Sequence, residues 1–177
     1  MSILEYRTLR REEARLLGSI DRAEVIDGFY SVVAGKLELR STRLDVTGWE
    51  DGQVEAYVAR LVALFDAGGT ILGAFQGPDL LGLGSLDVRP VGGDPRVSKL
   101  DMLYVSSVAR NRGIGRKLTA LLSEQARARG ARALYVSATP TRNTVDAYLR
   151  MGAKLLDSPD PDLFLREPED VHLLIEL

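Results

Sequence analysis

The residue pattern with the clearest chemical meaning is Arg110-x-x-Gly113-x-Gly115, which Arg116 and Lys117 follow directly. It stands between a β-rich stretch and an amphipathic helical stretch. The start of a helix has unpaired backbone N–H groups and the positive end of the helix dipole. Glycines at such a start let a ligand approach the backbone closely. The pattern therefore predicts a cradle for a pyrophosphate; the alternative is a basic turn that only caps a surface helix.

The distribution of charge favours an anionic ligand near this pattern. The chain has a net charge of −2, but residues 107–154 contain ten Lys or Arg and only two acidic residues. Residues 155–177 contain seven acidic residues and one Arg. A local basic block attracts anions. The overall negative charge and the aromatic content of 6% argue against nucleic acid as the partner, so we expect a small phosphorylated cofactor.

The composition excludes several kinds of site. Cysteine is absent and His172 is the only histidine, so we expect no disulfide, no cysteine nucleophile and no bound metal. No uncharged apolar stretch approaches about 18 residues, and the first residues carry no signal-peptide pattern. We therefore expect a cytoplasmic protein without a membrane partner. A length of 177 residues with 45% apolar residues predicts a single domain over residues 1–177.

The elements around the pattern are expected from hydrophobic periodicity and turn residues. A hairpin is predicted over residues 29–40, with its turn at Ala34-Gly35 and a second strand that can extend to Val46. Helices are predicted at 10–17, 50–67, 113–129 and 141–151, and strands at 3–9, 70–76, 80–91, 97–106, 131–138, 154–157 and 170–177. Three antiparallel strands followed by a β-α-β-α-β run predict a mixed α+β sheet flanked by helices.

Two motifs at this separation resemble those of the GNAT superfamily of N-acetyltransferases. Arg110-x-x-Gly113-x-Gly115 after a strand is similar to the superfamily's motif A, Q/R-x-x-G-x-G/A. Asn143 after the next strand, with Tyr148 four residues before a glycine, resembles motif B. The resemblance covers about residues 70–157 well and the N-terminal third only in outline.

The resemblance implies a twisted, mixed sheet of about seven strands, flanked by about four helices. The sheet would be antiparallel in its middle, with a splay between the fourth and fifth strands. The predicted hairpin would be an addition to that fold. It could pack over the core, shape the acceptor site or form a dimer contact, and a homodimer is one expectation.

The resemblance also implies acetyl-CoA as cosubstrate, held in the splay without a metal. Backbone groups of Leu103 and Val105 would pair with its pantetheine arm, and Asn143 would hydrogen-bond the same arm. The amides from Arg110 to Arg116 would hold the pyrophosphate. The cofactor-binding residues implied in this way are Leu103, Tyr104, Val105, Arg110, Asn111, Arg112, Gly113, Ile114, Gly115, Arg116, Asn143 and Tyr148.

The implied reaction is acetyl transfer to a primary amine of a small molecule or a peptide. Because cysteine is absent, direct attack by the bound amine is expected, with Tyr148 as the general acid that protonates the leaving thiolate. The alternative for Tyr148 is a core tyrosine. An alternative for the whole chain is a catalytically silent domain that binds acetyl-CoA as a sensor or assembly module.

The general base is where this sequence departs from part of the family. Some members have a Glu at the position that Lys99 occupies here. Asp101 lies two residues further along, on the same strand face. It is predicted either as the base, directly or through water, or as a salt-bridge partner at the sheet surface. A water chain without a dedicated base is the third alternative.

Further candidates have two interpretations each. His172 is either a base near the acceptor amine or a half-buried strand residue. Trp49, Phe29 and Tyr30 either line the acceptor pocket or pack in the core. The acidic residues of the tail either attract a cationic amine or form a solvated loop; they are Asp157, Asp160, Asp162, Glu167, Glu169 and Asp170.

Overall fold

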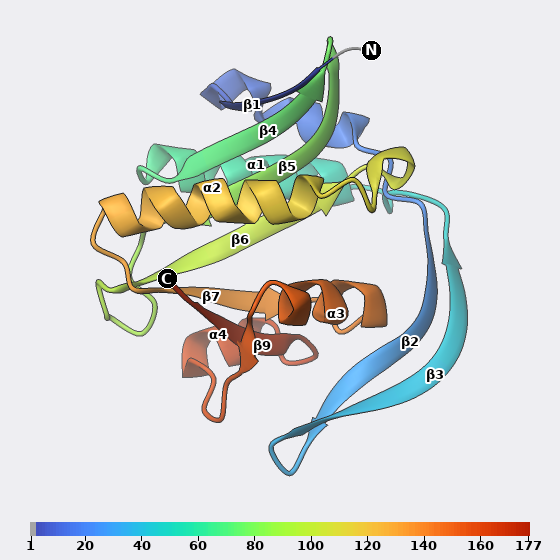
Figure 1. Ribbon diagram of the computed structural model, residues 1–177, viewed down its shortest axis with the longest axis vertical. Coiled ribbons are helices and arrows are strands. Elements are labelled where there is room, and N and C mark those ends of the chain that lie inside the picture. The colour runs from blue at the N-terminus through green and yellow to red at the C-terminus, as the bar shows by residue number, and fades with distance from the viewer. Residues whose placement is uncertain (1–2) are drawn as a thin grey trace.

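The computed structural model describes residues 3–177, and its main feature is one seven-stranded sheet in the order β1-β4-β5-β6-β7-β9-β8 (Figure 1). Neighbouring strands are antiparallel except β6 and β7, which are parallel. The strands are β1 (Leu4–Thr8), β4 (Thr70–Gln76), β5 (Asp79–Asp87), β6 (Val97–Val105), β7 (Ala133–Ala138), β8 (Lys154–Leu155) and β9 (Val171–Glu176). The predicted mixed α+β fold is confirmed.

Helices cover both faces of this sheet. The 3₁₀-helix η1 (Arg11–Ser19) and helix α1 (Gln53–Asp66) pack on one face, over a core that includes Leu17, Leu61 and Leu64. Helix α2 (Ile114–Ala128) packs on the other face through Leu118 and Leu122. The remaining helices are η2 (Ser107–Ala109), α3 (Arg142–Arg150) and α4 (Pro161–Arg166). The apolar stripes of α1 and α2 therefore pack against the sheet, as their periodicity predicted.

A β-bulge in β6 separates this strand from β7. Ser85 in β5 faces Met102, whereas Leu86 faces Leu100, so Asp101 is the extra residue of the bulge. The Ser85 hydroxyl accepts a hydrogen bond from the Met102 amide at 3.1 Å. A bulge bends its strand and increases its twist, and the pairing of β6 with β7 ends two residues earlier, at Lys99. The predicted splay between the fourth and fifth strands of the sheet is thus confirmed.

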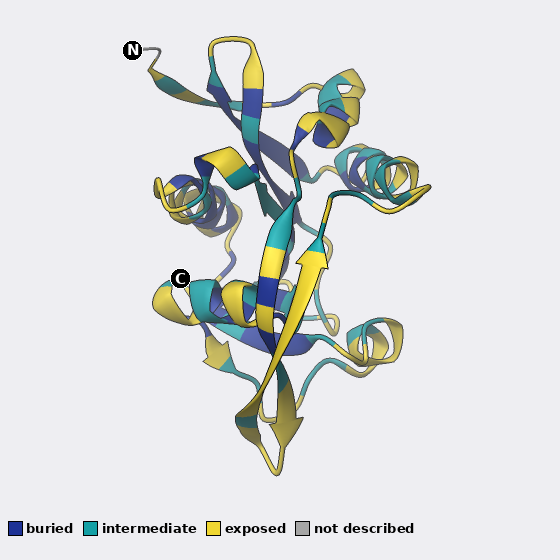
Figure 2. Cartoon of the chain, turned by 90° about the vertical axis from the view of Figure 1, so that its right-hand side faces the viewer, coloured by how far each residue is buried: buried dark blue, intermediate teal, exposed yellow. Residues whose placement is uncertain are grey.

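A second, two-stranded sheet is formed by β2 (Glu24–Val33) and β3 (Lys36–Val46). Its turn lies at Ala34 and Gly35, both with positive φ, as the sequence predicted. The hairpin is longer than the predicted residues 29–40, because β2 begins at Glu24. Figure 1 shows it running along one side of the molecule with β3 outermost, and Figure 2 shows that β3 is mostly exposed.

Several predicted boundaries are corrected. The strand predicted over 80–91 ends at Asp87, because the Arg89 amide and guanidinium turn back to its carboxylate and Pro90 has no amide donor. The helix predicted over 10–17 is a 3₁₀-helix. The loop predicted over 158–162 contains the start of α4, where the Asp160 carboxylate accepts a hydrogen bond from the Leu163 amide at 2.9 Å. Within residues 3–177, no helix is long and apolar enough to cross a membrane.

Candidate functional site

The loop before α2 has the geometry that an anion-binding helix start requires. Gly113 is the N-cap residue in the left-handed conformation, with φ 79°, and its position is not capped by any side chain. Among residues 3–177, no acceptor is found for the backbone amides of residues 113–116. Arg116 and Lys117 are exposed in the first turn. Unpaired amides, the helix dipole and two cations therefore meet at one place.

Arg110 does not point its guanidinium at these amides. It donates to the carbonyl oxygen of Val105 at 3.2 Å and to that of Ala23 at 2.8 Å. Arg110 thereby ties the segment before β2 to the end of β6. Arg112 donates to the Gln76 side chain at 3.2 Å. The predicted roles of these two side chains toward a cofactor stay predictions, whereas the backbone of the loop is free to bind.

The edge of β6 that faces the splay has backbone groups without strand partners. The Ser106 amide donates to the Leu81 carbonyl of β5 at 2.8 Å. Because backbone direction alternates along a strand, the groups of Leu103 and Val105 face the opposite edge, toward β7. A Cβ atom at Gly115 would lie 3.6 Å from the Val105 side chain and 3.8 Å from that of Leu103. The start of α2 thus lies directly over the unpaired part of β6.

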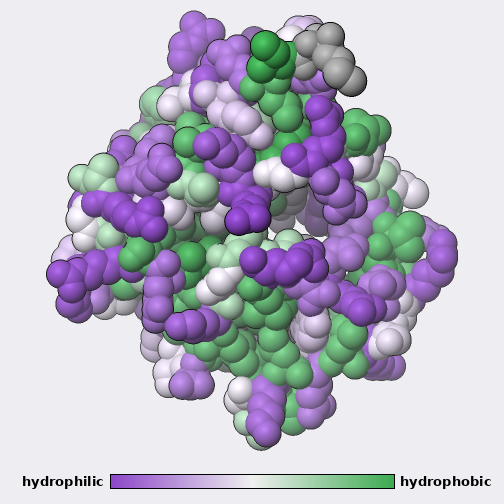
Figure 3. All heavy atoms as spheres, in the orientation of Figure 1, coloured by the Kyte–Doolittle hydropathy of each residue, from purple (hydrophilic) through white to green (hydrophobic). Residues whose placement is uncertain are grey.

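The surface is hollowed where these groups meet. Figure 3 shows a depression between the half of the molecule that contains α2 and the half that contains β7 and α3. The splayed edge of β6 and the start of α2 belong to one side of it and α3 to the other. The backbone groups on the splayed edge of β6 could hydrogen-bond an extended molecule, and the amides at the start of α2 could bind an anionic group at the end of that molecule.

Tyr148 is the buried polar residue of α3, on the other side of the splay. Its side chain is 7% exposed, and within residues 3–177 its hydroxyl has no hydrogen-bond partner. Burial raises the pKa of Tyr148 well above its usual value, and the negative charge of Asp101 raises it further. The hydroxyl is therefore protonated at neutral pH, and its predicted role as a proton donor stays a prediction.

Asn143, the other predicted residue of α3, is already engaged. Its side-chain amide donates to the Glu24 carboxylate at 2.9 Å and to the Val25 carbonyl at 3.3 Å. Both acceptors belong to β2. The predicted hydrogen bond from Asn143 to a cofactor is not tested by the structure, and it would have to coexist with these contacts or replace them.

The segment of residues 21–30, here called the crossing segment, joins the two sides of the splay. At one end, the Ser107 amide donates to the Asp21 carbonyl at 2.8 Å. At the other end, the Tyr30 amide donates to the Pro140 carbonyl at 2.7 Å, just before α3. The Tyr30 hydroxyl donates to Asp146 of α3 at 2.8 Å. The crossing segment, which includes the start of the hairpin, therefore contacts both the end of β6 and α3. A role of the hairpin in the acceptor site or in a dimer contact stays a prediction.

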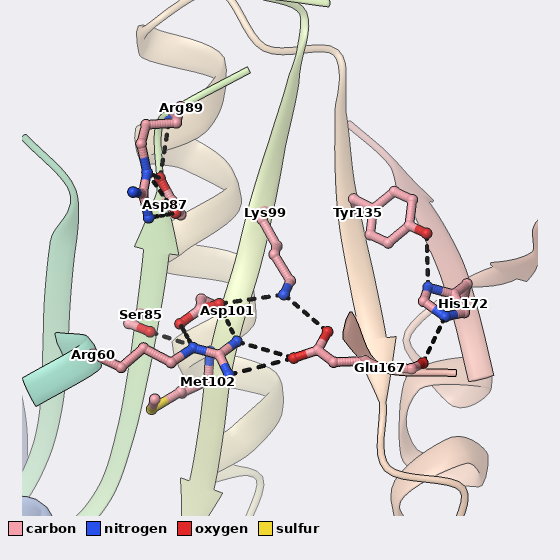
Figure 4. A network of polar contacts seen from close by, with 10 residues as sticks. All are labelled: Arg60, Ser85, Asp87, Arg89, Lys99, Asp101, Met102, Tyr135, Glu167 and His172. Carbon is pink, nitrogen blue, oxygen red and sulfur yellow. Dashed lines mark hydrogen bonds and ion pairs between the residues drawn. The ribbon is translucent and has the colours of Figure 1, made fainter. Parts of the chain in front are cut away.

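On the α1 face of β6, four charged side chains form one network (Figure 4). The Arg60 guanidinium contacts Asp101 at 2.5 Å and Glu167 at 3.3 Å. The Lys99 ammonium contacts the same two carboxylates, at 3.4 Å and 3.1 Å. Burial alone would raise the pKa of Glu167, but Lys99 and Arg60 outweigh it and the pKa lies below its usual value. The salt-bridge interpretation of Asp101 is thus observed; its role as a base stays a prediction.

His172 belongs to a hydrogen-bonded chain that holds α4 in place. The Glu167 carbonyl can only accept, so His172 Nε2 donates to it at 3.1 Å. In the neutral imidazole Nδ1 then accepts from the Tyr135 hydroxyl at 2.7 Å, and that hydroxyl accepts from the Asp160 amide at 3.2 Å. Asp160 and Glu167 are the residues at the two ends of α4. The His172 side chain is buried, and burial lowers its pKa, which favours the neutral form that this chain requires.

An aromatic cluster lies further along the same face of β6. Tyr104 packs against Trp49 and Tyr57, with ring centroids 5.1 Å and 6.2 Å apart. The Arg22 guanidinium lies 5.3 Å from the centre of the Trp49 ring. The Trp49 indole donates to the Ile20 carbonyl at 2.8 Å, so Trp49 also anchors the segment that leads into the hairpin. Trp49 packs against Tyr104 on the α1 face of β6, whereas Phe29 and Tyr30 contact the loop before α3.

Sequence reasoning missed two residues of this region, Arg60 and Ser85, and it did not predict the ion pairs of a third, Glu167. Arg60 was only a polar position of an amphipathic helix, and Ser85 an ordinary strand residue. Glu167 was one of several acids in the tail. None has a sequence signal of its own, because each acquires its role from a partner on another element. Among residues 3–177, no group of three or more His, Asp or Glu side chains could hold a metal ion.

Known proteins are similar to this chain both in sequence and in structure. The sequence model of the acetyltransferase (GNAT) family matches residues 37–153. No curated protein matches the sequence at a significant level. Nourseothricin acetyltransferase has a similar structure, with a TM-score of 0.69 and 22% identity over 97% of this chain and 95% of that chain.

Two further solved structures extend this likeness. The PaiA N-acetyltransferase from Thermoplasma acidophilum, in complex with coenzyme A, has a TM-score of 0.66 and 16% identity; 99% of each chain is covered. A GNAT family acetyltransferase from Elizabethkingia anophelis, with acetyl-CoA bound, has a TM-score of 0.54 and 15% identity, over 67% of this chain and 82% of that one. At these identities the structures show a shared fold.

Proposed function

This chain belongs to the GNAT acetyltransferase family, and from that premise we propose that it transfers an acetyl group from acetyl-CoA to a primary amine. One observation carries the proposal. The edge of β6 at Leu103 and Val105, which has no strand partner on the splay side, leads directly to the unpaired amides at the start of α2. On this edge the Val105 carbonyl already accepts from Arg110 at 3.2 Å. An extended arm that ends in a pyrophosphate fits these two sets of groups in sequence. The crystallised relatives that contain coenzyme A or acetyl-CoA support the same ligand.

The residues of the chain would act on the reaction as follows. The amine nitrogen attacks the thioester carbonyl carbon, the C–S bond breaks, and the sulfur leaves with the electron pair. Tyr148 is the proposed donor of the proton that this thiolate takes up, since its hydroxyl is protonated and has no other hydrogen-bond partner among residues 3–177, on a residue that is 7% exposed. The proton lost by the amine goes to water or to Asp101. Holding both reactants in one splay would supply much of the rate acceleration.

The acceptor amine is proposed to enter from the α1 face of β6. Asp101 and Glu167 lie on this face with Arg60 and Lys99, and the aromatic cluster around Tyr104 lies beside them. Carboxylates and aromatic faces both attract ammonium groups, and an entering amine would compete for them with Arg60, Lys99 and Arg22. An amine-bearing small molecule or peptide is therefore the proposed substrate class.

The experiment that tests the proposal is a steady-state assay of coenzyme A release from acetyl-CoA with a panel of primary amines. The panel contains polyamines, amino sugars, amine-terminated peptides and nourseothricin, since one structural relative is named for that acceptor. Release of free thiol that depends on one of these amines would support the proposal. Tight binding of acetyl-CoA without transfer to any acceptor would instead support the catalytically silent, acetyl-CoA-binding domain.

A further inference from the structure

Strand β3 forms a long, exposed sheet edge with no strand beside it. Nine of its eleven residues are exposed, and only Leu37 and Val46 are partly buried. Leu39 and Leu44 are 39% and 48% exposed. Its inner edge pairs with β2, and the structure gives it no second strand among residues 3–177. An unpaired edge of this length is a template for pairing with another strand, and a two-stranded ribbon is marginally stable by itself.

A bulge changes which residues of β3 share a face. Ser41 pairs with Gly28 and Leu44 with Ile26, so two residues, Thr42 and Arg43, together oppose one residue of β2. Residues on either side of the bulge that are an odd number apart therefore lie on the same face. One face of β3 carries Lys36, Glu38, Arg40, Arg43 and Asp45, and the other carries Leu37, Leu39, Ser41, Leu44 and Val46.

With the residues distributed over the two faces in this way, the charged and apolar side chains of β3 can pair with those of a second β3 in one antiparallel register. When the bulge residues Thr42 and Arg43 are counted as one position of the strand, a two-fold axis through Arg40 places Lys36 opposite Asp45 of a second copy and Glu38 opposite Arg43. On the other face it places Leu37 opposite Leu44. A two-fold axis perpendicular to the sheet requires paired residues to share a face, and the bulge is what brings these pairs onto common faces. Each opposite-charge pair and each apolar pair occurs twice, because the interface is symmetric.

We propose that the outer edge of β3 is the docking surface for a second copy of this chain, which joins the two hairpins into a four-stranded antiparallel sheet. The occupant is assigned by charge complementarity. In this register four opposite-charge pairs form per dimer, with Arg40 at the axis flanked diagonally by Glu38 of each copy. The interface lies beside the crossing segment, which continues β2 toward the splay. It makes no use of the residues proposed for acetyl transfer.

The test uses two charge reversals that each break the same pair between the copies; Asp45→Lys also removes the ion pair of Asp45 with Arg43 of its own chain, at 3.4 Å. Asp45→Lys places Lys opposite Lys36, and Lys36→Asp places Asp opposite Asp45, so each variant alone sets like charges against each other twice. Mixed together, the two variants restore both opposite-charge pairs in a heterodimer. Sedimentation velocity and light scattering measure the mass of each sample, and circular dichroism confirms that both variants stay folded.

The wild-type chain is expected to dimerise, and each single variant to dissociate at least about tenfold more readily. The equimolar mixture and the double variant Lys36→Asp with Asp45→Lys are both expected to recover the dimer. A wild-type chain that stays monomeric at roughly 100 μM would overturn the proposal. So would a dimer that is indifferent to Asp45→Lys, or a mixture that stays monomeric, because either result places the contact elsewhere.

Discussion

Lys99 and Tyr135 form the last residue pair between β6 and β7, and the two strands part immediately beyond it. Both side chains are on the α1 face. The Lys99 ammonium binds Asp101 and Glu167, and the Tyr135 hydroxyl binds His172. The point at which the sheet opens is therefore held by a charge network and a hydrogen-bonded chain, both of which include Glu167. The end of the strand pairing and the tail of the protein are therefore joined by direct contacts.

Replacing Tyr148 by phenylalanine should separate catalysis from folding and binding. We expect turnover to fall by about 10²–10⁴-fold, because the proposed proton donor is lost. Stability should change by less than about 1 kcal/mol, since the hydroxyl has no hydrogen-bond partner among residues 3–177. Steady-state kinetics with the identified acceptor, together with thermal unfolding, make the measurement. Wild-type turnover in Tyr148→Phe would remove this residue from the chemistry.

Replacing Asp101 by asparagine should destabilise the fold, because it leaves Arg60 and Lys99 with one carboxylate instead of two. The Asp101 side chain is 6% exposed, but that of Arg60 is 38% exposed, so we expect a loss of about 1–3 kcal/mol, less than for a fully buried pair. Urea denaturation measures it. Lys154→Ala is the matched control, since the Lys154–Glu176 pair is exposed and should contribute less than about 1 kcal/mol.

The same variant tests the proposed base. If Asp101 accepts the proton of the amine, the folded variant should lose turnover while it still binds acetyl-CoA. Full turnover of folded Asp101→Asn would show that water alone performs this step.

His172→Ala should cost stability rather than chemistry. The substitution removes the acceptor of the Tyr135 proton and the donor to the Glu167 carbonyl, so both ends of α4 lose an anchor. We expect a loss of about 2–3 kcal/mol. Tyr135→Phe, which removes one link of the same chain, should cost less. A well-folded His172→Ala protein that has selectively lost turnover would contradict this assignment.

Asp170 should make the protein less stable as the pH rises. Burial, and next the charge of Glu167, raise the pKa of Asp170 to about 6, whereas an unfolded chain has an Asp pKa of about 3.9. Between these values the folded protein binds a proton that the unfolded chain does not, so the free energy of unfolding falls as pH increases through this window. Asp170→Asn removes the buried carboxylate, and with it the cost of ionising this group in the folded protein.

The Asp170→Asn protein should therefore be more stable than wild type at about pH 7.5, by about 1–3 kcal/mol, and nearly equal to it at about pH 4. Urea titrations at the two pH values measure the difference, with Asp157→Asn in the exposed part of the tail as the control. A stability difference that does not change between the two pH values would refute the assigned cause.

Local patterns in the sequence predicted much of the fold. The stripe of α2 was expected over 113–129 and is observed over Ile114–Ala128, because Leu118 and Leu122 recur at helical spacing. The position of the splay followed from the family resemblance. The bulge at Asp101 could not be predicted, since it depends on how Ser85 pairs with Met102 across two strands.

The candidate site was predicted less completely, for the same physical reason. The backbone of the loop at Gly113 has the expected helix-start geometry. The contacts of Arg110 with Ala23 and of Asn143 with Glu24 join segments that are far apart in the chain. No local sequence pattern predicts such contacts, so the position of the crossing segment between β6 and α3 could be seen only in the structure.

The most direct test of the central claim is a calorimetric titration of the protein with acetyl-CoA, with ATP and a short DNA duplex as controls. The wild-type chain should bind acetyl-CoA with a dissociation constant in roughly the micromolar range and should bind neither control comparably. Gly115→Ala is expected to keep the fold and most of the affinity, because its Cβ would be in ordinary contact with Val105 and Leu103. Gly115→Leu, whose longer side chain extends over the splay, should weaken binding by about 100-fold or more at an unchanged melting temperature. Absence of binding to the wild-type chain, or wild-type affinity in Gly115→Leu, would contradict the account.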